Sequence, residues 1–203
     1  MKCIIGIILG LLIGFATPAF SENAPKSEFK PAKDFKLMVL GTRKLMTLEQ
    51  FKGAPLVLEW SNPDCPFVQK HYDSDNMQKL QKKYTALGIK WGIVFSGKTA
   101  KIKEKLLKNY YRRDKKIAKD VLLLTDESGD AGHDYGAKTT PHLFVIDAKS
   151  NLVYFGAIDD HRSADDNGFD KAKNFVAPVL DDLIAGKTPT QEPQAPYGCS
   201  VKY

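Results

Sequence analysis

Cysteine is scarce in this sequence, with three residues among 203. So few cysteines exclude a small scaffold that depends on many disulfides. Internal repeats and low-complexity tracts are also missing, and a hydrophobic share of 43% excludes a disordered or collagen-like chain. The chain is therefore expected to fold as one ordinary domain with short appendages.

Long hydrophobic runs are missing as well, because the apolar run from Cys3 to Phe15 is short for a membrane span. It follows one lysine and precedes the small-residue site Ala19-Phe20-Ser21, the layout of a secretory signal peptide. We predict that residues 1–21 are cleaved near Ser21 and that the protein is exported to the periplasm or another extracytoplasmic location. An uncleaved N-terminal anchor is the alternative. Residues 22–34 then form a polar leader.

The rest of the chain alternates strand and helix patterns. Strands are expected at 56–60, 89–95, 121–124, 143–147 and 152–156, and helices from Pro66, around 77–87, at 99–118 and at 169–185. This order predicts an α/β domain over residues 35–186, with a central mixed sheet covered by helices on both faces. Residues 187–203 form an extended C-terminal tail.

Negative charge is in deficit, with 24 Asp and Glu against 30 Lys and Arg, a net charge of +6. Residues 98–119 alone hold ten basic and two acidic side chains. The simplest interpretation is the solvated face of a helix, and weak contact with an anionic membrane surface is the alternative. No motif for nucleic acid is present. Asp159-Asp160 and Asp165-Asp166 are interpreted as a solvated acidic loop, with a divalent-ion site as the minor alternative.

Cys65 follows the first long strand and precedes Pro66, a residue favoured at the first position of a helix. A thiol at a helix N-terminus feels the positive end of the helix dipole, so its pKa falls below about 8.5. The neighbouring Asp64 opposes this fall. The position indicates a nucleophilic or redox cysteine, and a small buried apolar residue is the alternative.

Pro141 lies directly before the strand at 143–147, which is compatible with a cis Thr140–Pro141 bond. With Cys65, this arrangement resembles the thioredoxin fold, in which a cis-proline loop faces the active cysteine. Glu59 matches the buried acid that helps move the proton of an attacking thiol in that family. A salt-bridged strand residue is the alternative for Glu59.

Several separate blocks carry a closer resemblance, at residues 59–68, 70–72, 136–147, 156–160 and 197–203. From about residue 34 onward, the chain resembles exported redoxins of the alkyl hydroperoxide reductase/thiol-specific antioxidant group. The resemblance implies an antioxidant or disulfide-exchanging oxidoreductase with Cys65 as its nucleophile. It also implies a substrate groove formed by Thr140, Pro141, His142, Asn62 and Trp60.

Two departures from the better-understood relatives are visible. Val68 stands where a thioredoxin has the second cysteine of Cys-x-x-Cys, so no local thiol can resolve a mixed disulfide at Cys65. Asn62 stands where peroxiredoxins carry threonine or serine, and His142 lies near the place of their arginine. Asn62 can still donate a hydrogen bond to a peroxide, and His142 is a candidate for lowering the pKa of Cys65.

Cys199 lies in the tail, which is long enough to cross one face of the domain. We interpret it as a resolving cysteine that closes a disulfide with Cys65. A static structural disulfide, an intermolecular bond and a free thiol remain alternatives, as does a non-catalytic binding module or metal carrier. The expected partners are a peroxide or disulfide substrate and an external thiol reductant. No cofactor or metal is expected.

Overall fold

The computed structural model describes residues 29–97, 103–165 and 169–203. The predicted signal peptide lies outside these residues, as does most of the polar leader. No helix in the described part of the chain is long and apolar enough to cross a membrane.

The domain is built on an eight-stranded mixed sheet with the order β1-β9-β8-β4-β5-β6-β2-β3. Its strands are β1 Lys30–Pro31, β2 Leu37–Val39, β3 Leu45–Met46, β4 Leu56–Trp60, β5 Lys90–Ser96, β6 Leu122–Asp126, β8 His142–Ile146 and β9 Asn151–Gly156. Strands β4, β5 and β6 are parallel, whereas β8 pairs antiparallel with β4 and β9. The predicted mixed sheet and its hairpin are therefore confirmed.

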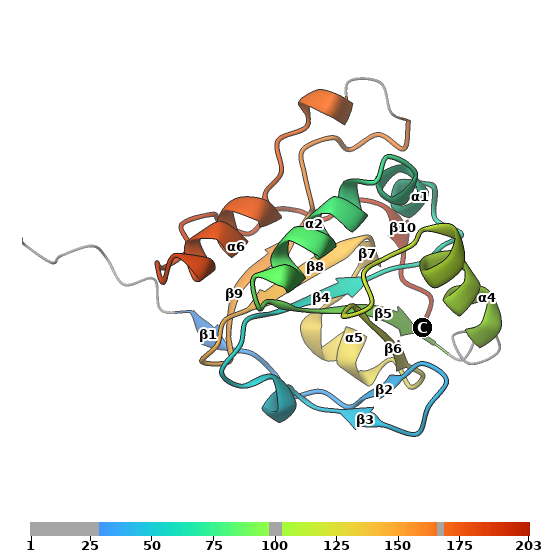
Figure 1. Ribbon diagram of the computed structural model, residues 1–203, viewed down its shortest axis with the longest axis horizontal. Helices are drawn as coiled ribbons and strands as arrows, with labels where there is room; N and C mark the ends of the chain where they lie inside the picture. The colour runs from blue at the N-terminus through green and yellow to red at the C-terminus, as the bar shows by residue number, and fades with distance from the viewer. Residues whose placement is uncertain (1–28, 98–102, 166–168) are drawn as a thin grey trace, which may run out of the picture.

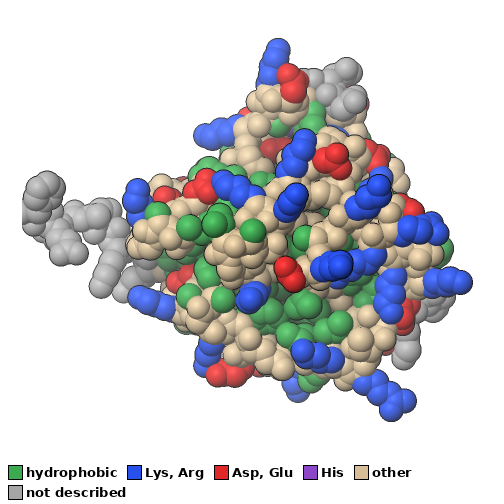
Figure 2. Space-filling view, viewed as in Figure 1, with side chains coloured by type: hydrophobic (Ala, Val, Ile, Leu, Met, Phe, Trp, Pro, Cys, Tyr) green, Lys and Arg blue, Asp and Glu red, His purple; other side chains and the backbone are tan. Residues whose placement is uncertain are grey.

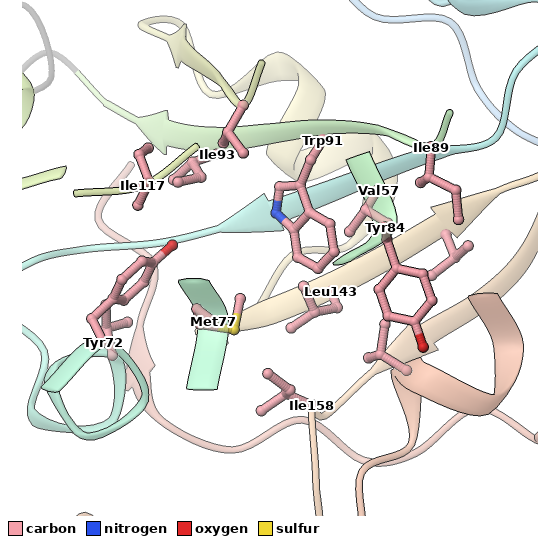
Figure 3. Packing of buried hydrophobic residues seen from close by; sticks show 14 of the residues in the cluster. Val57, Tyr72, Met77, Tyr84, Ile89, Trp91, Ile93, Ile117, Leu143 and Ile158 are labelled. Carbon is pink, nitrogen blue, oxygen red and sulfur yellow. The ribbon is translucent and has the colours of Figure 1, made fainter. Parts of the chain in front are cut away.

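Helices cover both faces of this sheet, as predicted (Figure 1). They are α1 Pro66–Asp73, α2 Asn76–Ala86, α4 Glu104–Lys108, α5 Asp130–Tyr135 and α6 Val176–Ile184, with short helices at Leu48–Phe51, Asn109–Asp114 and Phe169–Lys171. One buried cluster packs α1, α2 and α6 against the sheet, and a second packs α5 and Leu48–Phe51 against its other face. Figure 3 shows the first cluster, where Trp91 and Leu143 of the strands meet Met77 of α2.

Two helix predictions were wrong in extent. The described part of the expected helix at 99–118 is only α4 followed by a π-helical turn. Leu107 of α4 and Tyr111 of the turn are buried, whereas Leu106 of α4 is exposed. The expected helix at 169–185 begins only at Val176, because the side chain of Asn174 caps it by accepting hydrogen bonds from the first backbone N–H groups. The Phe169–Lys171 segment is a separate 3₁₀ turn.

The leader and the tail both take part in the fold. Lys30 and Pro31 of the leader form β1, an edge strand on β9. Cys199–Ser200 of the tail form β10, which pairs antiparallel with β7, Thr139–Thr140. The tail therefore crosses the end of the sheet, and the C-terminus lies beyond the ends of β5 and β6 (Figure 1). Basic side chains are frequent on the side where α4 lies (Figure 2).

Candidate active site

Cys65 is the N-cap residue of α1, at the point where the chain leaves β4. The connecting turn is fixed by the Asn62 carbonyl, which accepts from the Cys65 N–H at 3.0 Å, and by the Asn62 side chain, which accepts from the Asp64 N–H at 3.0 Å. Pro66 occupies the first position of the helix, where its missing N–H has no cost. This geometry holds the Cys65 thiol at the positive end of α1.

The Cys65 thiol is buried beneath the loop that precedes Pro141. It donates a hydrogen bond to the Thr140 carbonyl at 3.0 Å, and the Thr140–Pro141 peptide bond is cis. In the register between β7 and β10, Cys199 lies directly opposite Thr140. The strand pairing thus brings the tail cysteine to the same carbonyl that Cys65 contacts.

Both cysteines are free thiols, and their side chains are hydrogen-bonded to one another. Burial acts to raise the pKa of Cys65, but hydrogen bonds from the Cys199 and Thr140 side chains and from the Val68 and Cys199 backbone together outweigh it, so this pKa lies below its ordinary value. Burial and the bond to Cys65 raise the pKa of Cys199 to about 11. Cys65 is therefore the more acidic thiol of the pair, and it loses its proton more readily than Cys199.

Glu59 lies on β4, completely buried behind the cysteine turn. Its carboxylate accepts hydrogen bonds from the Tyr72 hydroxyl at 2.7 Å, the Trp91 ring nitrogen at 3.0 Å and the Gln81 amide at 3.2 Å. In Figure 3 the Tyr72 hydroxyl and the Trp91 nitrogen point into one region between them. Burial raises the pKa of Glu59 to about 7, although these bonds oppose the rise. Its donors are neutral, unlike those of a salt-bridged strand residue.

Tyr111 is a site residue that sequence reasoning missed. Its hydroxyl is 2.9 Å from the Ser61 hydroxyl, and the charges of both Glu59 and Cys65 raise its pKa after the larger effect of burial. It therefore lies within electrostatic reach of the acid and the thiol. The only sequence signal was a tyrosine in a helix pattern, and the π-helical turn that directs it inward could not be read from that pattern.

A cavity of about 480 Å³ opens beside the thiol pair. Cys199 lines it, whereas Cys65 is not among the lining residues and has no exposed surface. The other lining residues are Trp60, Ser61, Asn62, Pro63, Asp64, Phe95, Ser96, Lys103, Leu107, Thr140, Val201 and Lys202. An ion pair between Lys103 and Asp64, at 2.7 Å, lies among them. The cavity can hold a small molecule next to Cys199.

The structure brings most of the predicted site residues together, with His142 placed apart. Cys65, Cys199 and Thr140 are in contact, and Asn62 and Trp60 line the cavity next to them. The Trp60 ring nitrogen donates to the Ser96 hydroxyl at 3.0 Å, which fixes the indole in the cavity wall.

His142 pairs with Trp60 across the sheet and packs on Phe144 with ring centroids 4.4 Å apart, in the cluster on the face away from Glu59. Its Nδ1 accepts from the Lys138 N–H at 3.2 Å, and its buried Nε2 has no hydrogen-bond partner among the described residues. Burial lowers its pKa to about 4.

The tail is also fixed on its N-terminal side of Cys199. The Tyr197 hydroxyl donates to Asp159 and lies 3.1 Å from the ring nitrogen of His71 on α1. Asp159 itself is buried, so the expectation that it belongs to a solvated loop was wrong. Within the described ranges, no group of three or more His, Cys, Asp or Glu side chains could hold a metal ion.

Comparisons with known proteins agree with this architecture. The family model described as Redoxin matches residues 27–173. An uncharacterized conserved protein from Geobacillus kaustophilus gives a TM-score of 0.71 at 22% identity, covering 86% of this chain and 91% of that one. A hypothetical protein from Sinorhizobium meliloti 1021 gives 0.68 at 25% identity, covering 86% and 93%. A Neisseria meningitidis protein assigned as a thioredoxin gives 0.50 at 17% identity, covering 63% and 79%. No curated protein matches the sequence.

Proposed function

Because the chain belongs to the redoxin family, we propose that it is a thiol–disulfide oxidoreductase whose redox-active pair is Cys65 and Cys199. One observation carries the proposal: two free thiols, distant in sequence, are hydrogen-bonded to each other with pKa shifts of opposite direction. The lower pKa of Cys65 supports its role as the attacking thiolate, and the place of Cys199 supports a resolving role.

In the first half-reaction, the Cys65 thiolate attacks one sulfur of a substrate disulfide and expels the other as a thiolate. A mixed disulfide then joins Cys65 to the substrate. Cys199 loses its proton, attacks the sulfur of Cys65 and releases the second substrate thiolate. The pair becomes a disulfide, and the substrate has gained two electrons. Glu59, with a pKa of about 7, can take up a proton at neutral pH behind the thiol pair.

An external thiol reductant then reduces the Cys65–Cys199 disulfide back to two thiols. The cavity supports attack at Cys199, since Cys199 lines it and Cys65 is completely buried. The reductant thiolate forms a mixed disulfide with Cys199 and releases Cys65 as a thiolate, the better leaving group because its pKa is lower. A second reductant thiol then frees Cys199.

Peroxide reduction is the second candidate, and the complete burial of Cys65 favours it, because a peroxide is small enough to pass beneath the tail. In this reaction the Cys65 thiolate attacks a peroxide oxygen and becomes a sulfenic acid, and an alcohol or water leaves. Cys199 then condenses with the sulfenic acid to give the same disulfide and water. Asn62 and Thr140 are among the polar residues that line the cavity, and the Thr140 carbonyl contacts Cys65.

The test is a comparison of two oxidants on the reduced protein carrying Cys3→Ser. Glutathione disulfide and hydrogen peroxide are added separately, and thiols and adducts are followed by mass spectrometry. A disulfide exchanger forms the Cys65–Cys199 bond rapidly with the first oxidant, and Cys199→Ser leaves glutathione on Cys65. A faster reaction with peroxide, and sulfenic acid trapped at Cys65 in Cys199→Ser, would instead establish peroxide reduction. If Cys65 reacts with neither oxidant, both functions are excluded.

We also propose that the protein acts after export, on the basis of the signal-peptide layout of residues 1–21. An extracytoplasmic compartment is where a dithiol that can become a disulfide is useful. Intact mass measured on protein from the producing cells checks this proposal. A chain beginning near residue 22 supports export, and an intact N-terminus in the cytoplasmic fraction contradicts it.

A further inference from the structure

The last residue of the chain, Tyr203, lies in a notch formed by two glycines at the start of α5. We call Gly129 and Gly132 the glycine notch. A Cβ atom at Gly132 would lie 2.5 Å from the Tyr203 ring and 2.7 Å from its hydroxyl oxygen, and one at Gly129 would lie 2.8 Å from the ring. Atoms do not approach this closely, so the ring fits only because both side chains are missing.

Two further contacts fix the ring in the notch. It stacks on His133, with ring centroids 3.9 Å apart and an interplanar angle of 24°. Its hydroxyl donates a hydrogen bond to the Ala137 carbonyl at 2.6 Å. Tyr203 nevertheless keeps 48% of its surface exposed, so it contributes little to the hydrophobic core.

The notch lies at the end of a continuous path that the tail follows. Gly198 lets the tail backbone approach the Thr140 carbonyl, because a Cβ there would lie 2.1 Å from that oxygen. The tail then pairs with β7 at Cys199, and the Val201 N–H donates to the Lys138 carbonyl at 3.1 Å. Tyr203 follows four residues after Cys199, so fixing its ring limits how far Cys199 can move from Cys65.

We infer that Tyr203 is a positioning residue that holds Cys199 against Cys65, through the contact of its ring with the glycine notch. The inference rests on the proposed function, because it assigns Tyr203 to the resolving step of that reaction. The strand pairing of β10 with β7 covers only two residues and is too short to be stable alone. On the other side of Cys199, Tyr197 is fixed to Asp159 and α1, so Tyr203 completes a two-sided attachment.

The effective concentration of Cys199 at Cys65 measures this role directly. It is obtained by equilibrating the chain carrying Cys3→Ser with mixtures of reduced and oxidised glutathione and quantifying the Cys65–Cys199 disulfide. Tyr203→Ala is expected to lower it roughly tenfold, because the aromatic contact and the hydroxyl bond are both lost. Tyr203→Phe keeps the stacking and is expected to retain most of the wild-type value.

Gly132→Ala tests the same contact from the other side. Alanine favours a helix, so α5 is expected to be retained while the added methyl group displaces the Tyr203 ring. The effective concentration of Cys199 at Cys65 in Gly132→Ala should therefore fall as it does in Tyr203→Ala. Glu192→Ala, an exposed position earlier in the tail, is the matched control and should leave the value unchanged. A second readout is the pKa of Cys65, which should rise when Cys199 no longer donates to it.

Effective concentrations for Tyr203→Ala and Gly132→Ala within about twofold of the wild type would overturn the inference. So would a drop in Tyr203→Phe as large as that in Tyr203→Ala, since the ring would then not be the anchor. The glutathione equilibrium needs no physiological substrate. The pKa of Cys65, read from the ultraviolet absorbance of its thiolate, needs no oxidant at all. In a protein whose Cys65 reacts with neither oxidant, Tyr203→Ala can still raise this pKa, and an active protein can lack the Tyr203 effect, so the two failures are distinguishable.

Discussion

At the scale of single residues, the site depends on groups whose ionisation is set by burial and by a few hydrogen bonds. Cys65 and Cys199 share one environment, yet the pKa of the first is lowered and that of the second is raised to about 11. Burial acts to raise both pKa values, and the hydrogen bonds that Cys65 receives reverse the shift at that sulfur alone. A buried thiolate that accepts several donors is stabilised, and the thiol that donates to it keeps its proton.

Glu59 offers a measurable consequence of burial. Its pKa is about 7 in the folded protein against 4.5 as the ordinary value, so the folded state holds an extra proton between these two values. The stabilising contribution is complete below pH 4.5 and is lost as the pH rises through 7, by about 3 kcal/mol. Glu59→Gln removes this dependence.

Urea unfolding at a series of pH values checks the Glu59 prediction. The free energy of unfolding of the wild type, minus that of Glu59→Gln, should fall as the pH rises from 4.5 to 8. The pKa values of His71 and His142 are lowered to about 3 and about 4 in the folded protein, so in this interval they titrate only in the unfolded chain. Their effect is common to both proteins and cancels in the difference. A constant difference would contradict the assignment.

The sequence was sufficient to predict the positions of residues that are determined by their neighbours along the chain. Cys65 and Pro66 define their own position at a helix N-terminus, and Glu59 lies on a strand whose apolar run marks it as buried. The place of His142 could not be predicted in the same way. It depends on the antiparallel register that pairs it with Trp60, and that register is set by strands far apart in the sequence.

At the scale of elements, the tail is connected to α1 by a buried polar group of three side chains. Tyr197 donates to Asp159 and lies 3.1 Å from His71, and Asp159 also accepts from the His161 N–H at 3.1 Å. Each member is buried, so each needs the others as partners. The helix that carries Cys65 and the segment that carries Cys199 are thereby held in one arrangement.

Tyr197→Phe is expected to destabilise the protein by about 1 to 3 kcal/mol, because it leaves Asp159 and His71 buried without the hydroxyl. Urea unfolding at pH 7 measures the loss. Tyr203→Phe is the matched control, since it removes a hydroxyl from a half-exposed ring and should cost less than about 1 kcal/mol. Equal losses in the two variants would show that the buried group does not contribute.

Element lengths explain which parts of the fold could be predicted. The long buried strands and α2 have clear periodic patterns, whereas β1, β3, β7 and β10 have two residues each and leave no pattern. The π-helical turn after α4 changes the period of the helix, so a regular helical period over residues 99–118 does not predict which of its residues are buried. The tail was predicted only as an extended segment, because its pairing partners, such as Thr139–Thr140, are distant in sequence.

At the scale of the whole molecule, the thiol pair connects the start and the end of the domain. Cys65 follows β4, and Cys199 lies in β10, the last strand along the described chain. Folding therefore brings the two cysteines close together. In the unfolded chain the same approach would require closing a loop of about 130 residues, at a cost in conformational entropy. Folding and disulfide formation are thermodynamically linked through this loop.

The oxidised protein is accordingly expected to be more stable to unfolding than the reduced protein, by up to about 5 kcal/mol for a loop of this length. Urea unfolding with and without reductant measures the difference, and Cys199→Ser, which cannot form the bond, should show none. By linkage, the same free energy drives the folded dithiol toward the disulfide, so the reduced protein should be a good electron donor. An oxidised form no more stable than the reduced one would mean that bond formation pulls the tail from β7 and the glycine notch, which would contradict a catalytic pair already aligned in the dithiol state.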